Sequence, residues 1–310
     1  MGLKKKLASR EFSVLAEMET PRGVDISELV VNAQRLKGRV DAVVVPDMDY
    51  GAMRLSALAG AALMQQQGFE AVMHVYARDR NQLALQGDLL GAYVLGVRNV
   101  IVVSGEPISH CDHRKAKPVD DLDEVAILRM IRRLQEGQDL AGFELKGSPV
   151  FTVGCTLPAC ADRNQFDAAL EQARPKVAAG ADYVVMAPVF DLEQALWQLD
   201  RAKELGVPVV PTVLLLKSVG MARYMAVNEP GAKISEAMIA RIRKAHDREE
   251  ECLRISAEIV SGLKGAAPAV KLQALGWEHR LPAVLDLAGM RSAPAGRGEA
   301  APYPFILQAD

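Results

Sequence analysis

The sequence is poor in cysteine and aromatic residues, has no excess of charge of one sign, and contains no long hydrophobic run. Four cysteines in 310 residues are too few for a disulfide framework, so we expect reduced thiols in a cytoplasmic protein. A formal net charge of −2 gives no reason to expect nucleic acid or an anionic membrane as a partner. No apolar run reaches the roughly 18 residues of a membrane-spanning helix, so we expect no membrane span. The start, MGLKKKLASREF, lacks the apolar region of a secretory signal.

Motifs for metal and dinucleotide binding are also missing. The chain contains no HxH, HExxH or CxxC, and four residues including a proline separate Cys155 from Cys160. We therefore expect no metal site, although carboxylates and a histidine near the expected strand ends keep a divalent ion open as an alternative. No glycine-rich fingerprint follows the first apolar segment, which argues against a doubly wound sheet that binds a dinucleotide.

The chain does contain a regular alternation of two kinds of segment. Half of the residues are hydrophobic, and amphipathic stretches of helical period separate short runs rich in Val or Ile. The alternation predicts one α/β domain, a (β/α)₈ TIM barrel over residues 1–290, with a loosely held tail at 291–310. Residues 233–263 read as one long helical stretch, and 109–123 as the longest irregular segment. The predicted strands are 12–17, 41–46, 70–75, 99–105, 149–155, 182–188, 207–215 and 269–276.

Polar side chains gather where the predicted strands end. Active sites of TIM barrels lie at the carboxyl ends of the strands, so these side chains are the candidates for chemistry. Their mixture of acids and a few cations suits a protonatable organic substrate beside an anionic cofactor. In chain order the candidates are Glu17, Glu19, Asp47, Asp49, His74, residues 78–81 (RDRN), Ser104, Gly105, Glu106, Lys217 and residues 277–280 (WEHR).

Five segments then match a known pattern in order. They are EMETPRGVD (17–25), the run from RLSALAG to VIVVSGEP (54–107), AKPVDDLDE (116–124), KVAAGADYVVMAPVFD (176–191) and NEPGAKISEAM (228–238). With these segments the chain resembles the methylenetetrahydrofolate reductase family from about residue 12 to about residue 290. The resemblance is to the branch that also forms the reductase half of bifunctional homocysteine S-methyltransferase/methylenetetrahydrofolate reductase proteins.

The resemblance implies an oxidoreductase of one-carbon metabolism on a TIM barrel. In this family NAD(P)H reduces a flavin, usually FAD, and the flavin passes hydride to methylenetetrahydrofolate to give methyltetrahydrofolate. The five-membered ring of the substrate opens when its departing nitrogen is protonated, which leaves a cationic iminium. Glu17 aligns with the proton donor of the family, and Glu106 aligns with an aspartate that contacts the pterin.

The resemblance also assigns residues to the cofactor and to the folate. The family's flavin-contacting positions are occupied or adjoined by Asp47, His74, Arg78, Ser104 and Gly105. Lys176 aligns with a lysine near the adenosine phosphate, and Asp121 lies in an insert where it orders the loop or contacts ribose. Arg280 aligns with an arginine that holds the folate.

Two departures from the family pattern leave alternatives open. Ala187 replaces a glutamine that touches the pterin, and the loop CTLPACADRN (155–164) differs from the usual flavin-contacting run. A flavin-independent NAD(P)H reductase is one alternative, and a folate-binding subunit active only in a larger electron-transfer complex is another. A lyase with Lys217 as its Schiff-base lysine is a more distant one. Barrels of this family often associate. A homo-oligomer, or a complex with a partner electron-transfer subunit, therefore also stays open.

Overall fold

The eight predicted strands are all present and form a closed parallel barrel. The structure is a computed structural model that describes residues 2–9 and 11–290; the tail predicted at 291–310 lies outside the described residues. The strands follow one another around the barrel in chain order, and the first pairs with the last. The prediction of a (β/α)₈ TIM barrel is therefore confirmed. The strands are β1 (Ser13–Glu17), β2 (Ala42–Val45), β3 (Ala71–Val75), β4 (Asn99–Val102), β5 (Thr152–Leu157), β6 (Tyr183–Pro188), β7 (Val209–Leu214) and β8 (Ala269–Gln273).

Side chains of alternate residues along each strand fill the barrel. An interior cluster contains Leu15 of β1, Val44 of β2 and Tyr183 of β6, and a second, larger cluster packs the outer faces of the strands against the helices. The Tyr183 ring fits because β5 has Gly154 beside it, where an added Cβ would lie 2.5 Å from the ring. Helix α1 (Leu3–Leu7) adds its two leucines to the interior cluster.

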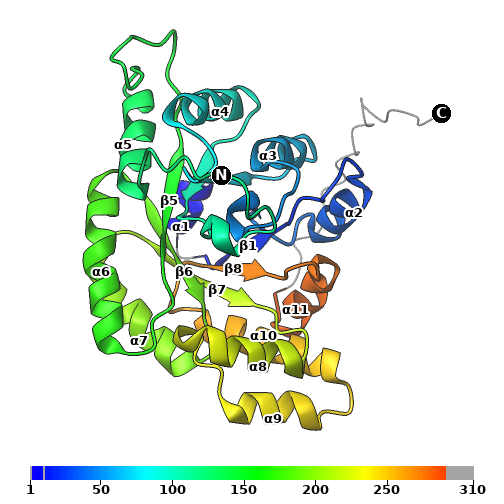
Figure 1. Ribbon diagram of the computed structural model, residues 1–310. Coiled ribbons are helices and arrows are strands. Elements are labelled where there is room, and N and C mark those ends of the chain that lie inside the picture. The colour runs from blue at the N-terminus through cyan, green and yellow to red at the C-terminus, as the bar shows by residue number, and fades with distance from the viewer. Residues whose placement is uncertain (1, 10, 291–310) are drawn as a thin grey trace, which may run out of the picture.

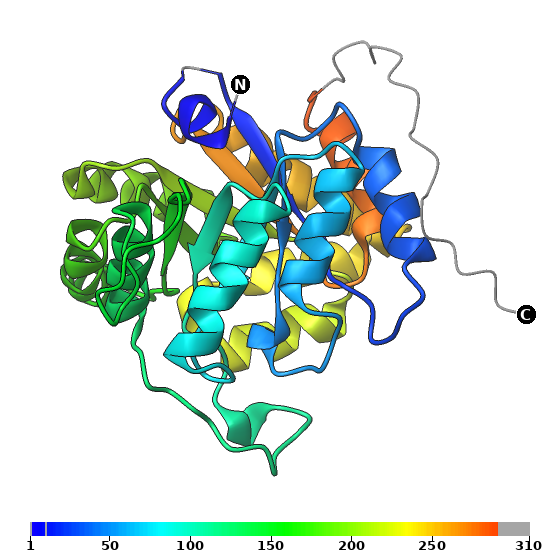
Figure 2. The ribbon, with the colours of Figure 1, turned by 90° about the horizontal axis from the view of Figure 1, so that it is seen from above.

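Within residues 2–9 and 11–290, ten further helices surround the strands (Figure 1, Figure 2). Most begin at a Ser, Asn or Asp whose side chain accepts a hydrogen bond from a backbone N–H of the first turn, as Ser56 does from Ala59. The helices are α2 (Ser27–Leu36), α3 (Ala57–Gln66), α4 (Gln82–Val94), α5 (Glu124–Gln135), α6 (Arg163–Ala178), α7 (Leu192–Ala202), α8 (Val219–Asn228), α9 (Glu236–Lys244), α10 (Arg248–Leu263) and α11 (Leu281–Leu287). No helix of the described part of the chain is long and apolar enough to cross a membrane.

The single helical stretch expected over 233–263 was wrong, because two helices occupy it. Helix α9 ends at Lys244, and the backbone of Ala245 is extended. Asp247 then caps α10 by accepting a hydrogen bond from the backbone N–H of Glu250. The cap lets the chain turn, so that α9 packs against both α8 and α10 at the edge of the molecule (Figure 1).

Five strands end at other residues than the sequence indicated: β2 and β7 end one residue earlier, β4 ends at Val102 instead of residue 105, and β5 and β8 also differ. Strand β5 runs to Leu157 instead of ending at residue 155, and β8 ends at Gln273 rather than at 276. These shifts decide which side chains of the two strands face the interior near the carboxyl ends, where the candidate site lies.

Candidate active site

A cavity of about 430 Å³ opens at the carboxyl ends of the strands. This volume lies within the range of pockets that hold small organic ligands. One wall is apolar and comes mainly from the inward or terminal residues Ile101, Val103, Leu157, Val185 and Met186. The opposite wall is polar and comes from Asp49, Tyr50, His74, Lys271 and Gln273. A planar organic ring with polar edges therefore suits the cavity.

Glu17, the last residue of β1, lies behind the polar wall. Its side chain is only 1% exposed, and its carboxylate pairs with Lys271 Nζ at 2.8 Å. The Tyr50 hydroxyl donates a hydrogen bond to the same carboxylate at 3.1 Å and accepts one from Gln273 Nε2 at 3.0 Å. Lys271, Tyr50 and Gln273 line the cavity, and Glu17 lies directly behind them.

The Tyr50 hydroxyl is held in its neutral form. Tyr50 belongs to the short 3₁₀ helix η1 (Met48–Tyr50), which follows β2. Burial of the hydroxyl raises its pKa well above 10, and the negative charges of Glu17 and Asp49 raise it further. Tyr50 therefore acts as a hydrogen-bond donor to Glu17 at neutral pH.

His74 of β3 forms a second polar pair at the cavity. Its Nδ1 lies 3.1 Å from Oδ2 of Asp49, and both side chains are buried. The other oxygen of Asp49 accepts the backbone N–H of Asp47 at 2.8 Å, which fixes the carboxylate. A carboxylate beside Nδ1 selects the tautomer that carries its proton there. The His74 ring also meets Tyr50 edge-on, with centroids 6.4 Å apart, so both polar pairs share one wall.

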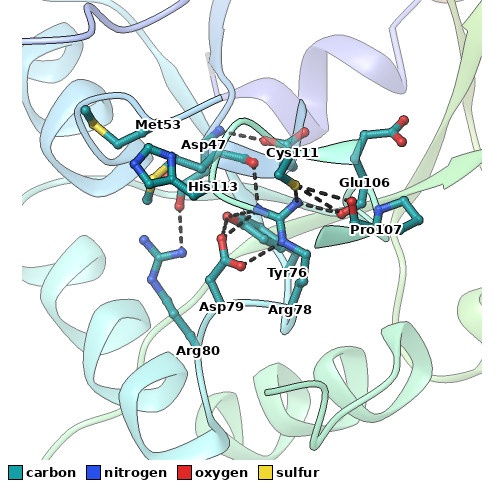
Figure 3. A network of polar contacts seen from close by, with 12 residues as sticks. Asp47, Met53, Tyr76, Arg78, Asp79, Arg80, Glu106, Pro107, Cys111 and His113 are labelled. Carbon is teal, nitrogen blue, oxygen red and sulfur yellow. Dashed lines mark hydrogen bonds and ion pairs between the residues drawn. The ribbon is translucent and has the colours of Figure 1, made fainter. Parts of the chain in front are cut away.

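Arg78 does not line the cavity but lies in a network of polar contacts with Tyr76, Asp79 and Cys111 (Figure 3). Its guanidinium makes two hydrogen bonds of 2.7 Å to the carboxylate of Asp79. It also donates to the carbonyl of Glu106 at 2.6 Å and to that of Met48 at 2.8 Å. Arg78 therefore joins the loop after β4 to the loop after β2. The N–H of Glu106 donates to the carbonyl of Asp49 and joins the same two loops.

Ser104 and Lys176 meet at a third residue, Glu124, which sequence reasoning did not single out. Both donate hydrogen bonds to the Glu124 carboxylate at the start of α5, and Lys176 also contacts the carbonyl of Thr156 at 3.3 Å. Glu124 is the last residue of the segment AKPVDDLDE. Its position beside the helix start is the sequence feature that could have identified Glu124 as a candidate.

The remaining predicted residues divide between the cavity and the loops around it. Gly105, Glu106 and Ala187 line the cavity together with His74 and Ser104. Gly105 has φ +77°, and an added Cβ would lie 3.0 Å from the Tyr76 ring, so glycine is required there. Ala187 follows an irregularity in the pairing of β6 with β7, between Val185 and Pro188.

Three predicted residues make contacts outside the cavity. Asp47 accepts from the backbone of Ala57 and pairs with Arg80 at 2.9 Å; burial raises its pKa, although the Arg80 charge opposes the rise. Asp121 accepts the backbone N–H of Gln82 at 2.9 Å and thereby fixes the insert to the start of α4. Arg280, in the 3₁₀ helix η5 (Glu278–Arg280), pairs with Glu249 of α10.

The residues near the cavity fit a flavin ring better than a flavin diphosphate. Phosphates are usually held by cations with free donors. Here Arg78 is paired with Asp79 and Lys176 with Glu124. A neighbouring hollow of about 320 Å³ is lined by three acids, Asp120, Asp123 and Glu124, and by one cation, Arg78, which is paired with Asp79. In this arrangement the site does not fit a diphosphate. Within residues 2–9 and 11–290, no three His, Cys, Asp or Glu side chains are grouped to hold a metal ion.

Fold and cavity together define a TIM-barrel protein with an acidic, hydrogen-bonded site at the carboxyl face of its strands. The chain belongs to the methylenetetrahydrofolate reductase family, whose sequence model matches residues 2–265. Members of this family are oxidoreductases that act on methylenetetrahydrofolate. No curated protein sequence matches the chain.

Two solved structures align with the chain at low sequence identity, and the one with a TM-score of 0.50 shares its fold. The spore cortex-lytic enzyme SleL of Bacillus cereus is 16% identical with a TM-score of 0.50, and the alignment covers 91% of this chain and 74% of that one. A putative deoxyribose-phosphate aldolase of Toxoplasma gondii ME49 is 11% identical with a TM-score of 0.43, over 92% and 96% of the two chains. At these identities the likeness concerns the barrel alone.

Proposed function

We propose that the protein reduces 5,10-methylenetetrahydrofolate to 5-methyltetrahydrofolate by hydride transfer. The observation that carries the proposal is the buried Glu17 carboxylate with its two donors, Lys271 and Tyr50, at the wall of the cavity. Glu17 stands where the family has its acid, and the resemblance to the branch of the bifunctional proteins supports the same assignment.

The reaction needs one proton and one hydride. Protonation of N10 breaks its bond to the one-carbon bridge, and the electron pair of that bond goes to N10. The bridge becomes an iminium on N5, and hydride then adds to its carbon to give the methyl group. A carboxylate close to the cavity stabilises the cationic iminium. We assign the donation of the proton to Glu17, while Glu106 at the rim and Arg280 are assigned to the folate.

The pterin contact of this chain differs from the family pattern. The side chain of Ala187 lines the cavity but offers no hydrogen bond where the family has a glutamine. Gln273 Nε2 lies on the opposite wall, where it donates to Tyr50. We assign pterin recognition to Glu106 and Gln273, with Ala187 leaving additional space.

The hydride source is assigned from the family. FAD would supply the hydride and NAD(P)H would reduce it; the residues that would hold it are His74, Ser104 and Gly105 near the ring, with Asp47, Arg78, Asp121 and Lys176 assigned to the rest of the cofactor from the resemblance. The loop CTLPACADRN (155–164) and Ala187, which depart from the family pattern, favour a second candidate, a reductase that takes hydride directly from NAD(P)H.

The test is an absorption spectrum of the purified protein, followed by the assay for methyltetrahydrofolate with NADH or NADPH. Released FAD supports the flavin route, whereas product formation by colourless protein supports the direct route. Glu17→Gln is expected to slow product formation at least 100-fold, roughly the contribution of one general acid. Glu19→Gln is the matched control, because Glu19 pairs with Arg54 away from the cavity. Absence of product from the wild-type protein under every donor, with or without added flavin, would sink the proposal.

A further inference from the structure

We infer that the hydroxyl group of Thr212 makes the polar contact to the pterin ring that a glutamine makes in the family pattern, where this chain has Ala187. This inference rests on the proposed function and names a specificity-determining residue of the same site. Thr212 belongs to β7 and lines the cavity, and only 2% of the residue is exposed. A hydroxyl group both donates and accepts hydrogen bonds, which suits the edge of a pterin, where donors and acceptors alternate.

The Thr212 hydroxyl is available to a ligand because no protein group in the described part of the chain forms a hydrogen bond with it. Among the described residues, the buried side-chain polar atoms that lack a hydrogen-bond partner are Arg39 Nε and Glu249 Oε1. The Thr212 hydroxyl is not one of these enclosed atoms, although it has no partner either. It is therefore open to the cavity that Thr212 lines.

Other buried polar side chains of the cavity wall are paired within the protein. His74 Nδ1 lies 3.1 Å from the carboxylate of Asp49, and Lys271 Nζ lies 2.8 Å from that of Glu17. Thr212 has no such partner, so its hydroxyl bonds to water as long as the cavity is filled with water. A ligand that displaces this water without replacing the hydrogen bond leaves a buried polar group unpaired, which costs binding free energy. The site therefore favours a ring whose edge bonds to Thr212 over one that is apolar there.

The pairing of the strands places Thr212 beside the position of the missing amide. Thr212 pairs in register with Pro188 of β6 on one side and with Lys271 of β8 on the other. Ala187 directly precedes Pro188, within the irregularity of β6, and both residues line the cavity. The carbonyl of Thr212 also accepts the backbone N–H of Val189 at 2.9 Å, which fixes this end of β6 against β7. Thr212 thus lies where the apolar wall meets the polar wall, next to the space that Ala187 leaves.

Substitutions of Thr212 test the contact by calorimetric titration with tetrahydrofolate. Thr212→Val keeps the branched shape but removes the hydroxyl, and is expected to weaken binding about tenfold or more, because a polar group of the ring then lacks its partner. Thr212→Ser keeps the hydroxyl and loses one methyl group, so its affinity is expected to stay within about threefold of wild type. Thr152→Val is the matched control, because it makes the same change in β5 away from the cavity and should leave the affinity unchanged.

Two further measurements show which part of the folate the hydroxyl contacts. 6-Methyltetrahydropterin carries the ring without the aminobenzoylglutamate tail, and Thr212→Val is expected to weaken its binding by the same factor as that of tetrahydrofolate. Ala187→Gln supplies an amide beside position 212. Combined with Thr212→Val, it is expected to recover most of the lost affinity, because the two side chains serve the same edge of the ring and their effects are not additive.

The outcomes separate this inference from the proposed function. A wild-type protein that binds no tetrahydrofolate or forms no product contradicts the proposed function itself. If the wild type is active, a Thr212→Val variant that binds tetrahydrofolate within about twofold of wild type contradicts the role of Thr212 alone, since loss of the contact costs more. A loss of affinity for tetrahydrofolate but not for 6-methyltetrahydropterin also contradicts it, because the hydroxyl would then contact the tail. If circular dichroism shows that Thr212→Val does not fold, Thr212→Ala takes its place in both titrations.

Discussion

Removing one partner of the ion pair between Glu17 and Lys271 is expected to cause a large loss of stability. Lys271→Met keeps most of the volume of the side chain and deletes its charge. The Glu17 carboxylate then stays 1% exposed, with the Tyr50 hydroxyl as its remaining side-chain donor among the described residues. Breaking a buried pair in this way costs about 3–5 kcal/mol, because an uncompensated charge remains in the interior.

A second lysine provides the scale for this loss. Lys6 pairs with Asp41 at the same distance of 2.8 Å, but those side chains are 27% and 32% exposed. Partly solvated pairs contribute about 0.2–1 kcal/mol, so Lys6→Met should cost no more than that. The expected difference between the two variants is therefore about 2–5 kcal/mol.

Urea unfolding followed by circular dichroism measures both losses under identical conditions. A loss of 3–5 kcal/mol corresponds to a fall in melting temperature of roughly 6–20 °C for a domain of this size. The double variant Glu17→Gln/Lys271→Met removes both charges and is expected to recover most of the stability, because no unpaired ion is left. Equal losses in Lys271→Met and Lys6→Met, or no recovery in the double variant, would refute the reasoning.

Three further predictions concern other parts of the molecule. Burial raises the pKa of the Cys155 thiol to about 12, so a thiol reagent at about pH 8 should leave this cysteine unmodified until guanidinium unfolds the protein; rapid modification in the native state would contradict it. Burial also raises the pKa of Tyr76 and Tyr183. The unfolded chain then releases protons above about pH 10 that the folded chain keeps, so stability falls by about 1.4 kcal/mol per pH unit for each tyrosine, and phenolate absorbance should appear together with unfolding. Ala187→Gln restores the amide of the family pattern and should tighten folate binding about 2–10-fold in a calorimetric titration, the value of one net hydrogen bond; unchanged affinity would place the pterin elsewhere.

The barrel itself was predictable because its strands carry a strong local signal. Most are short apolar runs rich in Val, Ile or Ala and buried on both faces, and the number of such runs indicates the architecture. Glu17 and His74 were predictable for the same reason. They are polar residues at or near the end of apolar strands, and alternation directs them into the barrel.

Lys271 and Gln273 were missed because the apolar segment of β8 runs past the end of the strand. Ending that strand at residue 276 directed attention to 277–280, whereas the strand ends at Gln273. Ala269 belongs to the interior cluster, so alternation places Lys271 and Gln273 on the same inner face. The lysine inside this apolar strand is the sequence feature that could have identified a residue of the site.

The contacts of the predicted cations could not be predicted from the sequence, for a different reason. Arg78 meets the carbonyl of Glu106, Lys176 meets Glu124, and Arg280 meets Glu249. The partners are 28 to 52 residues apart in the first two cases, and loops or helix starts bring them together. Residue type gives the charge of each side chain, but the closed barrel decides which opposite charge it meets.

The acid of the proposed site depends on closure of the barrel more directly than any other part. Glu17 comes from the first strand and Lys271 from the last, and the register pairs Leu15 of β1 with Lys271 of β8. The two charges therefore meet only when β8 has joined β1, the pairing that completes the sheet. Until then each charge is free to stay in water, and its burial is compensated only by the other. The same contact thus penalises a barrel that closes in the wrong register and positions the Glu17 carboxyl group behind the cavity wall, which ties correct folding to the chemistry we propose.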